Sequence, residues 1–169
     1  MEPTYVEWDH LGKHYRQVTH EYKLSILNDY CDRYPFKTFV ETGHYMGTTM
    51  DAMHNRFEKC YSIELNNTYY ERAFARFSGT NVTILQGDSE LVLPRILPRC
   101  EPPVLFWLDA HGDDWIGPVV KEVEAIYQWN RDGVILVDDM DYITDILPRH
   151  PYWDYEIIDG IARSCRVLE

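Results

Sequence analysis

The sequence predicts an α/β fold in which helices cover both faces of a mostly parallel sheet. Short apolar runs, each suited to one buried strand, alternate along the chain with segments that carry apolar residues at helical spacing. The final segment differs, because two runs there are separated by Asp159-Gly160, a strong signal for an antiparallel hairpin. We therefore expect parallel strands followed by an antiparallel C-terminal strand.

The composition indicates one globular domain that binds neither nucleic acid nor membrane. At 169 residues the chain has the size of one domain, and its 45% hydrophobic content argues against disorder. A formal net charge of −12 argues against a nucleic-acid partner, since such binding depends on clustered Lys and Arg. No apolar run approaches the length that a membrane span needs.

The four cysteines are scattered through apolar segments and lack the spacing of a zinc site: Cys31, Cys60, Cys100 and Cys165. Free thiols are typical of proteins in a reducing compartment. Because the first residues also lack an apolar signal core, the sequence predicts a cytoplasmic protein.

The first 35 residues are predicted to form a helical segment. Residues 18–34 carry apolar side chains at helical spacing, and Pro35 ends the pattern. Because residues 1–35 are rich in Tyr, Trp and His, we interpret them as a lid over the ligand site.

Residues 36–169 are predicted to form the ligand-binding core, so that residues 1–169 make a single domain. Its five parallel strands are expected at residues 37–42, 60–65, 82–86, 104–109 and 133–139. The helices between them are expected to begin near Gly47, at Asn66 or Asn67, after Asp88 and after Pro118.

Acidic residues stand where these strands end. They are Glu41, Glu64, Asp88, Asp109, and the pair Asp138 and Asp139. The carboxyl ends of parallel strands share one edge of the sheet, and ligands of open α/β sheets bind there. A single acid at such a place often only caps the next helix. When five strands each bring a carboxylate to one edge, we instead expect ligand hydroxyls, amines or a cation to compensate the negative charge.

The stretch "ETGHYMG" after the first strand fits the pattern ExGxxxG. Gly43 and Gly47 would let a ligand approach the backbone closely. The leading Glu41 would repel a pyrophosphate, so the loop favours a cationic or amine-bearing ligand. Glu64 is placed to accept hydrogen bonds from ribose hydroxyls, and Asp88 to accept one from an adenine amine.

The order of these motifs resembles that of class I S-adenosylmethionine-dependent methyltransferases, and more narrowly the FkbM-like group. The motifs are "VETG", "IEL", "GDS", "FWLDAHG" and the acidic end of the fifth strand, and the resemblance covers about residues 36–169. It implies a Rossmann-like, doubly wound sheet of seven strands, the last antiparallel. It also implies S-adenosylmethionine as the cofactor.

The resemblance further implies roles for particular residues. Glu41, Gly43 and Gly47 would surround the methionine part of the cofactor, Glu64 would hold the ribose and Asp88 the adenine. For His44 and Tyr45, contact with the cofactor and packing beside it are both open. The complete predicted cofactor-binding set is Glu41, Thr42, Gly43, His44, Tyr45, Gly47, Glu64, Asp88, Ser89 and Asp109.

"FWLDAHG" also supplies the candidate catalytic residues. Methyl transfer to oxygen requires removal of a proton from the acceptor, and His111 has the natural pKa for that task. Asp109 would orient His111 or bind a metal. The alternative is that His111 is a loop histidine tied to a neighbouring acid.

Asp109, Asp138 and Asp139 also form a candidate metal site. Three converging carboxylates would repel one another, and a hard divalent cation such as Mg²⁺ relieves that repulsion. The arrangement resembles metal-dependent O-methyltransferases of the catechol type. Here the pair is Asp-Asp rather than Asp-Asn, and the lysine that stands shortly after the first Asp in that group is absent after Asp109. The presence of a metal and the identity of the base are therefore both open.

The sequence thus predicts methyl transfer from S-adenosylmethionine to an oxygen of a small hydroxylated molecule. A nicotinamide-dependent oxidoreductase is the alternative enzyme, although it would need a GxGxxG loop that the sequence lacks. A non-catalytic cofactor-binding protein is the third interpretation.

Overall fold

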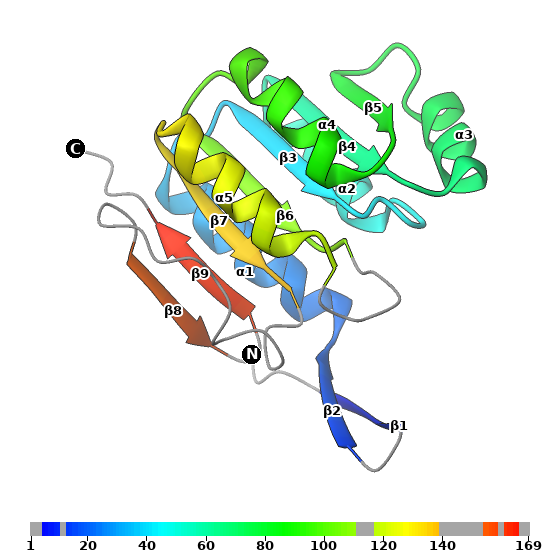
Figure 1. Ribbon diagram of the computed structural model, residues 1–169, viewed down its shortest axis with the longest axis vertical. Coiled ribbons are helices and arrows are strands. Elements are labelled where there is room, and N and C mark those ends of the chain that lie inside the picture. Colours follow the sequence, from blue (N-terminus) through cyan, green and yellow to red (C-terminus); the bar gives the residue numbers. More distant parts are fainter. Residues whose placement is uncertain (1–4, 11–12, 111–116, 139–153, 159–160, 166–169) are drawn as a thin grey trace.

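A seven-stranded sheet forms the centre of the computed structural model (Figure 1). The structure describes residues 5–10, 13–110, 117–138, 154–158 and 161–165, and for 5–18 and 154–165 it describes only the backbone. The strand order is β5-β4-β3-β6-β7-β9-β8. The first five of these strands are β3 (Thr38–Thr42), β4 (Lys59–Glu64), β5 (Val82–Gln86), β6 (Val104–Leu108) and β7 (Gly133–Val137).

These five strands pair in parallel, with β3 between β4 and β6. Each begins and ends within two residues of its expected position. The predicted Rossmann-like parallel sheet is therefore confirmed. Beyond it, β9 (Ile161–Cys165) runs antiparallel to β7 and also to β8 (Asp154–Ile158), and the intervening Asp159-Gly160 lies outside the described residues.

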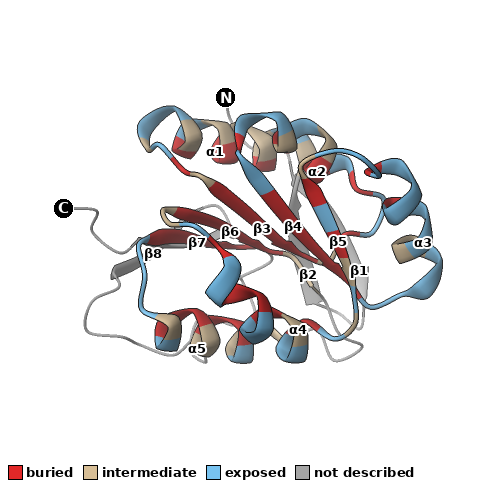
Figure 2. Cartoon of the chain, turned by 90° about the horizontal axis from the view of Figure 1, so that it is seen from above, coloured by how far each residue is buried: buried red, intermediate tan, exposed pale blue. Residues whose placement is uncertain are grey.

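Helices cover both faces of the sheet (Figure 2). One face carries α1 (His20–Arg33), α2 (Thr48–Met53) and α3 (Asn67–Arg76), and the other carries α4 (Ser89–Ile96) and α5 (Val119–Trp129). Two short 3₁₀ helices follow α2 and α4, at His54–Arg56 and Leu97–Arg99. Side chains cap three helices at the N-terminus, as their sequences suggest: Thr19, Asn66 and Asp88.

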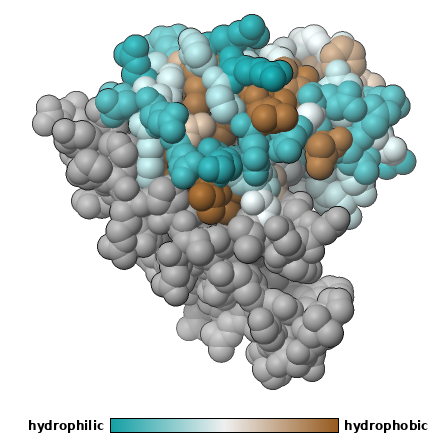
Figure 3. All heavy atoms as spheres, in the orientation of Figure 1, coloured by the Kyte–Doolittle hydropathy of each residue, from teal (hydrophilic) through white to brown (hydrophobic). Residues whose placement is uncertain are grey.

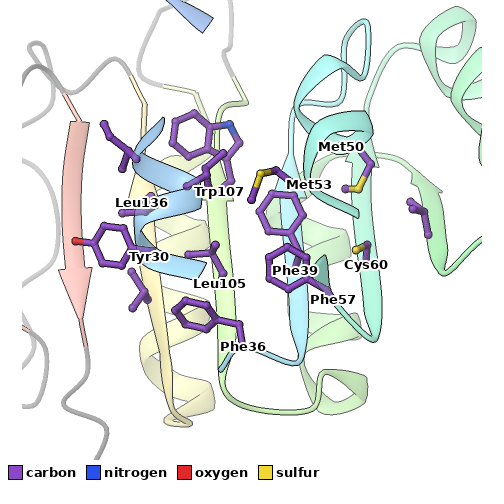
Figure 4. Close-up of a cluster of buried hydrophobic side chains, with 14 of the residues drawn as sticks. Tyr30, Phe36, Phe39, Met50, Met53, Phe57, Cys60, Leu105, Trp107 and Leu136 are labelled. Carbon is purple, nitrogen blue, oxygen red and sulfur yellow. The ribbon is translucent and has the colours of Figure 1, made fainter. Parts of the chain in front are cut away.

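Each face of the sheet has its own hydrophobic core because successive strand residues point to opposite sides. Phe39, Leu105 and Trp107 pack beneath α1 and α2 with the helix residues Met50 and Met53 (Figure 4). The intervening strand residues belong to the core under α4 and α5: Val40, Val104, Phe106 and Leu108. The two cores fix the register of the strands and thereby align their carboxyl ends.

The N-terminal segment differs from the prediction. Residues 1–35 were expected to be helical, but the helix begins only at His20, after a hairpin of β1 (Tyr5–His10) and β2 (Lys13–Val18). The hairpin register places Glu7 opposite Arg16 and Trp8 opposite Tyr15. Opposite charges and aromatic pairs at facing positions favour strand pairing, which explains the difference. The function of this segment as a lid stays a prediction.

The surface in view in Figure 3 is mostly hydrophilic where it is described, with a few separate hydrophobic side chains. None of the described helices has the length and apolarity to cross a bilayer. Three cysteines with described side chains are free thiols, as expected: Cys31, Cys60 and Cys100. Burial raises the pKa of the first to about 11 and of the other two to about 12, so all three are protonated at neutral pH.

Candidate functional site

A pocket of about 300 Å³ opens at the carboxyl edge of the sheet. Its walls come from the turns after β3, β4, β5 and β6 and from the turn before α5. The described lining residues are Gly43, Ile63, Glu64, Leu65, Gly87, Asp88, Ser89, Glu90, Ala110, Gly117 and Pro118. The pocket thus lies at the edge of the sheet where the sequence predicts a ligand site, and its volume lies at the lower end of the range for small-molecule sites.

The described charged residues that line this pocket are all acidic: Glu64, Asp88 and Glu90. A phosphate group would be repelled by this lining. A ligand with hydroxyls, amines or a positive charge would be stabilised by it.

Gly43 allows two strand ends to meet beside the pocket. Its φ is +79°, and a Cβ atom there would lie 2.4 Å from the backbone oxygen of Asp109. The backbone N–H of Asp109 donates to the oxygen of Thr42 at 3.1 Å, so the turns after β3 and β6 touch. Gly43 is therefore required for contact within the chain as well as for access to the pocket.

Gly47, in contrast, makes room for His44. A Cβ atom on Gly47 would lie 2.4 Å from Nε2 of His44, whose side chain is buried. The Nδ1 atom of His44 lies 2.8 Å from Oγ of Ser62 and 3.2 Å from Oε2 of Glu41. The Ser62 hydroxyl itself donates to Oε2 of Glu41 at 2.5 Å, and the tautomer of His44 with a proton on Nδ1 would complete this chain of hydrogen bonds.

Glu41, His44 and Ser62 therefore form a closed polar cluster beneath the loop, on the α1–α2 side of the sheet. Burial raises the pKa of Glu41, and the hydrogen bonds from His44 and Ser62 act in the opposite direction. None of the three is among the described pocket-lining residues. The arrangement matches the packing alternative for His44, and contact of Glu41 or His44 with a cofactor stays a prediction.

Glu64 links the loops after β3 and β4. Its Oε2 accepts the backbone N–H of Tyr45 at 2.8 Å, and its Oε1 accepts that of Asn66 at 2.7 Å. Tyr45 has a φ of +49°, and its exposed ring packs against Tyr69 with centroids 4.9 Å apart. Each carboxylate oxygen can accept a second hydrogen bond, so Glu64 keeps its capacity for ligand hydroxyls.

Asp88 caps a helix and also lines the pocket, and its contact with an adenine amine stays a prediction. Its side chain caps α4 by accepting the backbone N–H of Glu90 at 3.0 Å, and the residue also lines the pocket. The adjacent Ser89 is buried and lines the pocket as well.

The predicted metal set is not assembled among the described residues. Asp138 is buried and forms an ion pair with Lys23 of α1, while Asp139 lies outside the described residues. No group of three or more His, Cys, Asp or Glu side chains in the described part of the chain is arranged to hold a metal ion. The repulsion that suggested a divalent cation is thus relieved at Asp138 by an ammonium group.

The candidate catalytic residues are described only in part. Asp109 is partly exposed directly after β6, whereas His111 lies outside the described residues. The negative charge of Asp109 raises the pKa of Glu41, so these two acids repel each other across the Gly43 turn.

Glu122 was not predicted from the sequence. It lies in the first turn of α5, is 1% exposed, and neither carboxylate oxygen has a hydrogen-bond partner among the described residues. Burial raises its pKa to about 7, and the negative charges of Asp88 and Glu90 act in the same direction. The hydroxyls of Ser89 and Thr42 lower the pKa, although neither makes a hydrogen bond of normal geometry to the carboxylate.

Solved structures of several methyltransferases share this fold. The SAH-bound Podospora anserina methyltransferase PaMTH1 is 17% identical, with a TM-score of 0.64 over 88% of this chain and 79% of its own. A putative caffeoyl-CoA O-methyltransferase of Staphylococcus aureus is 15% identical, with a TM-score of 0.65 over 88% and 85%. A Bacillus cereus O-methyltransferase in complex with SAH is 12% identical, with a TM-score of 0.67 over 88% and 82%.

At these identities the likeness shows the fold alone. No protein-family model matches the sequence, and no curated protein is significantly similar to it.

Replacement of Gly43 by Ala is predicted to destabilise the protein more than replacement of Gly79. Both glycines have a φ of +79°, but only a Cβ on Gly43 meets backbone atoms, whereas one on Gly79 has no described heavy atom within 4 Å. We expect Gly79→Ala to cost about 1 kcal/mol from backbone strain and Gly43→Ala about 2 kcal/mol more. Urea unfolding measures both, and equal costs would contradict the close contact.

The Lys23–Asp138 pair is predicted to behave as a buried ion pair. Lys23→Met removes the ammonium partner of a buried carboxylate and is expected to cost about 3–5 kcal/mol, whereas Lys23→Met with Asp138→Leu costs clearly less. The control Lys37→Met breaks the exposed pair with Glu101 and should cost at most about 1 kcal/mol. Urea unfolding that ranks Lys23→Met no higher than Lys37→Met would refute the buried pair.

Glu122 is predicted to give the stability a pH dependence that Glu122→Gln abolishes. The pKa rises from an ordinary 4.5 to about 7 on folding, so the contribution of Glu122 is full below pH 4.5 and is lost as the pH rises through 7. The stability of Glu122→Gln relative to wild type should therefore increase by up to about 3 kcal/mol between pH 4 and pH 8. A pH-independent difference in urea unfolding would contradict the elevated pKa.

Proposed function

We propose that the protein is an S-adenosylmethionine-dependent methyltransferase of the FkbM-like group, which methylates an oxygen of a small hydroxylated molecule. The observation that carries this proposal is the acidic pocket at the carboxyl edge of the sheet, lined by Gly43, Glu64 and Asp88. These residues come from the motifs that predicted the same cofactor in the sequence, and the fold is that of the methyltransferases named above.

The residues of the pocket fit the groups of this cofactor. Glu64 retains lone pairs that can accept hydrogen bonds from ribose hydroxyls, and Asp88 can accept one from the adenine amine. Gly43 leaves the pocket wall without a side chain beside the strand end. The cofactor, when bound, supplies a methyl group on a positively charged sulfur, and the acidic lining favours that charge.

The remaining chemistry is alignment of the acceptor and removal of its proton. His111 is the proposed general base, with Asp109 as the residue that orients it; both come shortly after β6 in the sequence. The described residues do not hold a metal set, so no step is assigned to a metal.

A nicotinamide-dependent oxidoreductase is less well supported by this site. Its dinucleotide carries a pyrophosphate, and the described charged residues that line the pocket are all acidic. A non-catalytic protein that binds the same cofactor would share the pocket and differ only in turnover.

A thermal-shift experiment tests the proposal. S-adenosylmethionine and S-adenosylhomocysteine should each raise Tm, because a ligand at 100 times its Kd adds about 2.7 kcal/mol, whereas NAD should not. Stabilisation by NAD alone would overturn the proposal.

A substitution of Asp88 tests whether the cofactor binds in this pocket. Asp88→Ser keeps a good helix cap but removes the carboxylate, so the unliganded Tm should change little while the Kd for S-adenosylmethionine rises about tenfold or more. The control Glu58→Gln removes an exposed acid outside the pocket lining and should leave the Kd unchanged. Equal Kd values for the two variants would place the cofactor elsewhere.

A further inference from the structure

Glu122 lies directly behind the wall of the pocket. Its backbone N–H donates to the oxygen of Pro118 at 3.0 Å, and Pro118 lines the pocket. The hydroxyl of Ser89, also a lining residue, acts on its carboxylate, as does that of Thr42, which immediately precedes Gly43. Three elements thus surround the Glu122 carboxylate beside the pocket: the end of β3 and the first turns of α4 and α5.

Among the described residues, this buried carboxylate has no cationic partner and no hydrogen bond of normal geometry. Both of its oxygens, and Oγ1 of Thr42, lack a hydrogen-bond partner among the described residues. A buried and unsatisfied carboxylate is costly, and native proteins rarely keep one without a function or a ligand. The surrounding hydrophobic core would accept an apolar side chain here at no such cost.

The charged groups that act on Glu122 are acids. Asp88 and Glu90, at the start of α4, both disfavour its ionised form. On its own helix, Lys121 and Glu124 pair with each other at 3.0 Å on the outer side. From the sheet, Glu122 faces the hydroxyl of Thr42. A positive charge supplied from the pocket would therefore be the natural counterpart of this carboxylate.

We propose that Glu122 is a selectivity-determining residue, which makes the pocket prefer the positively charged S-adenosylmethionine to its uncharged-sulfur product S-adenosylhomocysteine. This inference rests on the proposed function. Methyl transfer removes one positive charge from the cofactor, so a buried carboxylate behind the pocket holds the substrate form more tightly than the product form. The product is then released more readily.

The effect has a definite pH dependence. The carboxyl of Glu122 has a pKa of about 7 and is ionised increasingly as the pH rises through that value. A cation in the pocket stabilises the ionised form, so the preference for S-adenosylmethionine grows between pH 6 and pH 8. Opposite charges at the effective dielectric constant of about 20 found in proteins interact by an amount equivalent to about tenfold in affinity at separations near 10 Å.

Calorimetric titration of the full chain with both compounds at pH 6 and pH 8 tests the inference. In the wild type, the ratio of the Kd for S-adenosylhomocysteine to that for S-adenosylmethionine should rise several-fold, up to about tenfold, between the two pH values. In Glu122→Gln the ratio of the two Kd values should not rise between pH 6 and pH 8. The control Glu124→Gln removes a more exposed acid from the same helix and should retain the rise.

The outcomes separate the two proposals. If the wild type binds neither compound, the proposed function fails. If both compounds bind and the ratio changes equally in wild type and Glu122→Gln, the function survives and the selectivity of Glu122 is refuted.

A second measurement does not depend on a variant. Carbon-13 NMR of the wild type, with the Glu122 signal assigned, should give a carboxyl pKa about one unit lower in the S-adenosylmethionine complex than in the S-adenosylhomocysteine complex. Equal pKa values in the two complexes would overturn the inference.

Discussion

Negative charge gathers where the five parallel strands end, and the way each acid is compensated determines the structure of the site. Glu41 is enclosed by His44 and Ser62, and Asp138 is neutralised by Lys23. Glu64 and Asp88 accept backbone N–H groups, which fixes the neighbouring loops and the start of α4. The protein therefore satisfies these acids largely from its own chain, and the acids at the pocket keep lone pairs for a ligand.

The same compensation divides the acids by function. Acids that are fully enclosed stabilise the fold. The Lys23–Asp138 ion pair joins α1 to the sheet, and the hydrogen bonds of the Glu41 cluster stabilise the loop that contains His44. Acids that line the pocket give it a negative charge that would repel a phosphate group. Glu122 belongs to neither group, because it is enclosed but lacks a partner among the described residues.

Much of the fold could be predicted because its signals are local. Apolar runs gave the five parallel strands, and the residues Asn66 and Asp88 marked helix starts that the structure confirms. The pocket also follows from local signals, since strand ends in a parallel sheet share one edge. The N-terminal hairpin was missed because its stability depends on pairing between residues 5–10 and 13–18, which a search for helical spacing does not detect.

The partners of the acids could not be predicted because they come from distant parts of the chain. Lys23 lies 115 residues from Asp138, and no local pattern joins them. One signal was present: Lys23 shares a helical face with Ile26, Leu27 and Tyr30, and Glu122 shares one with Val119, Val123 and Ile126. A charged residue on the apolar face of a helix indicates a buried pair or a buried functional group.

A crystal structure of the protein grown with S-adenosylhomocysteine would show whether the acidic pocket is the cofactor site. We expect the adenosine in the pocket, with its ribose hydroxyls on Glu64 and its adenine amine on Asp88, and the amino-acid part of the compound beside Gly43. Density for the compound away from these three residues, with the pocket empty, would contradict it.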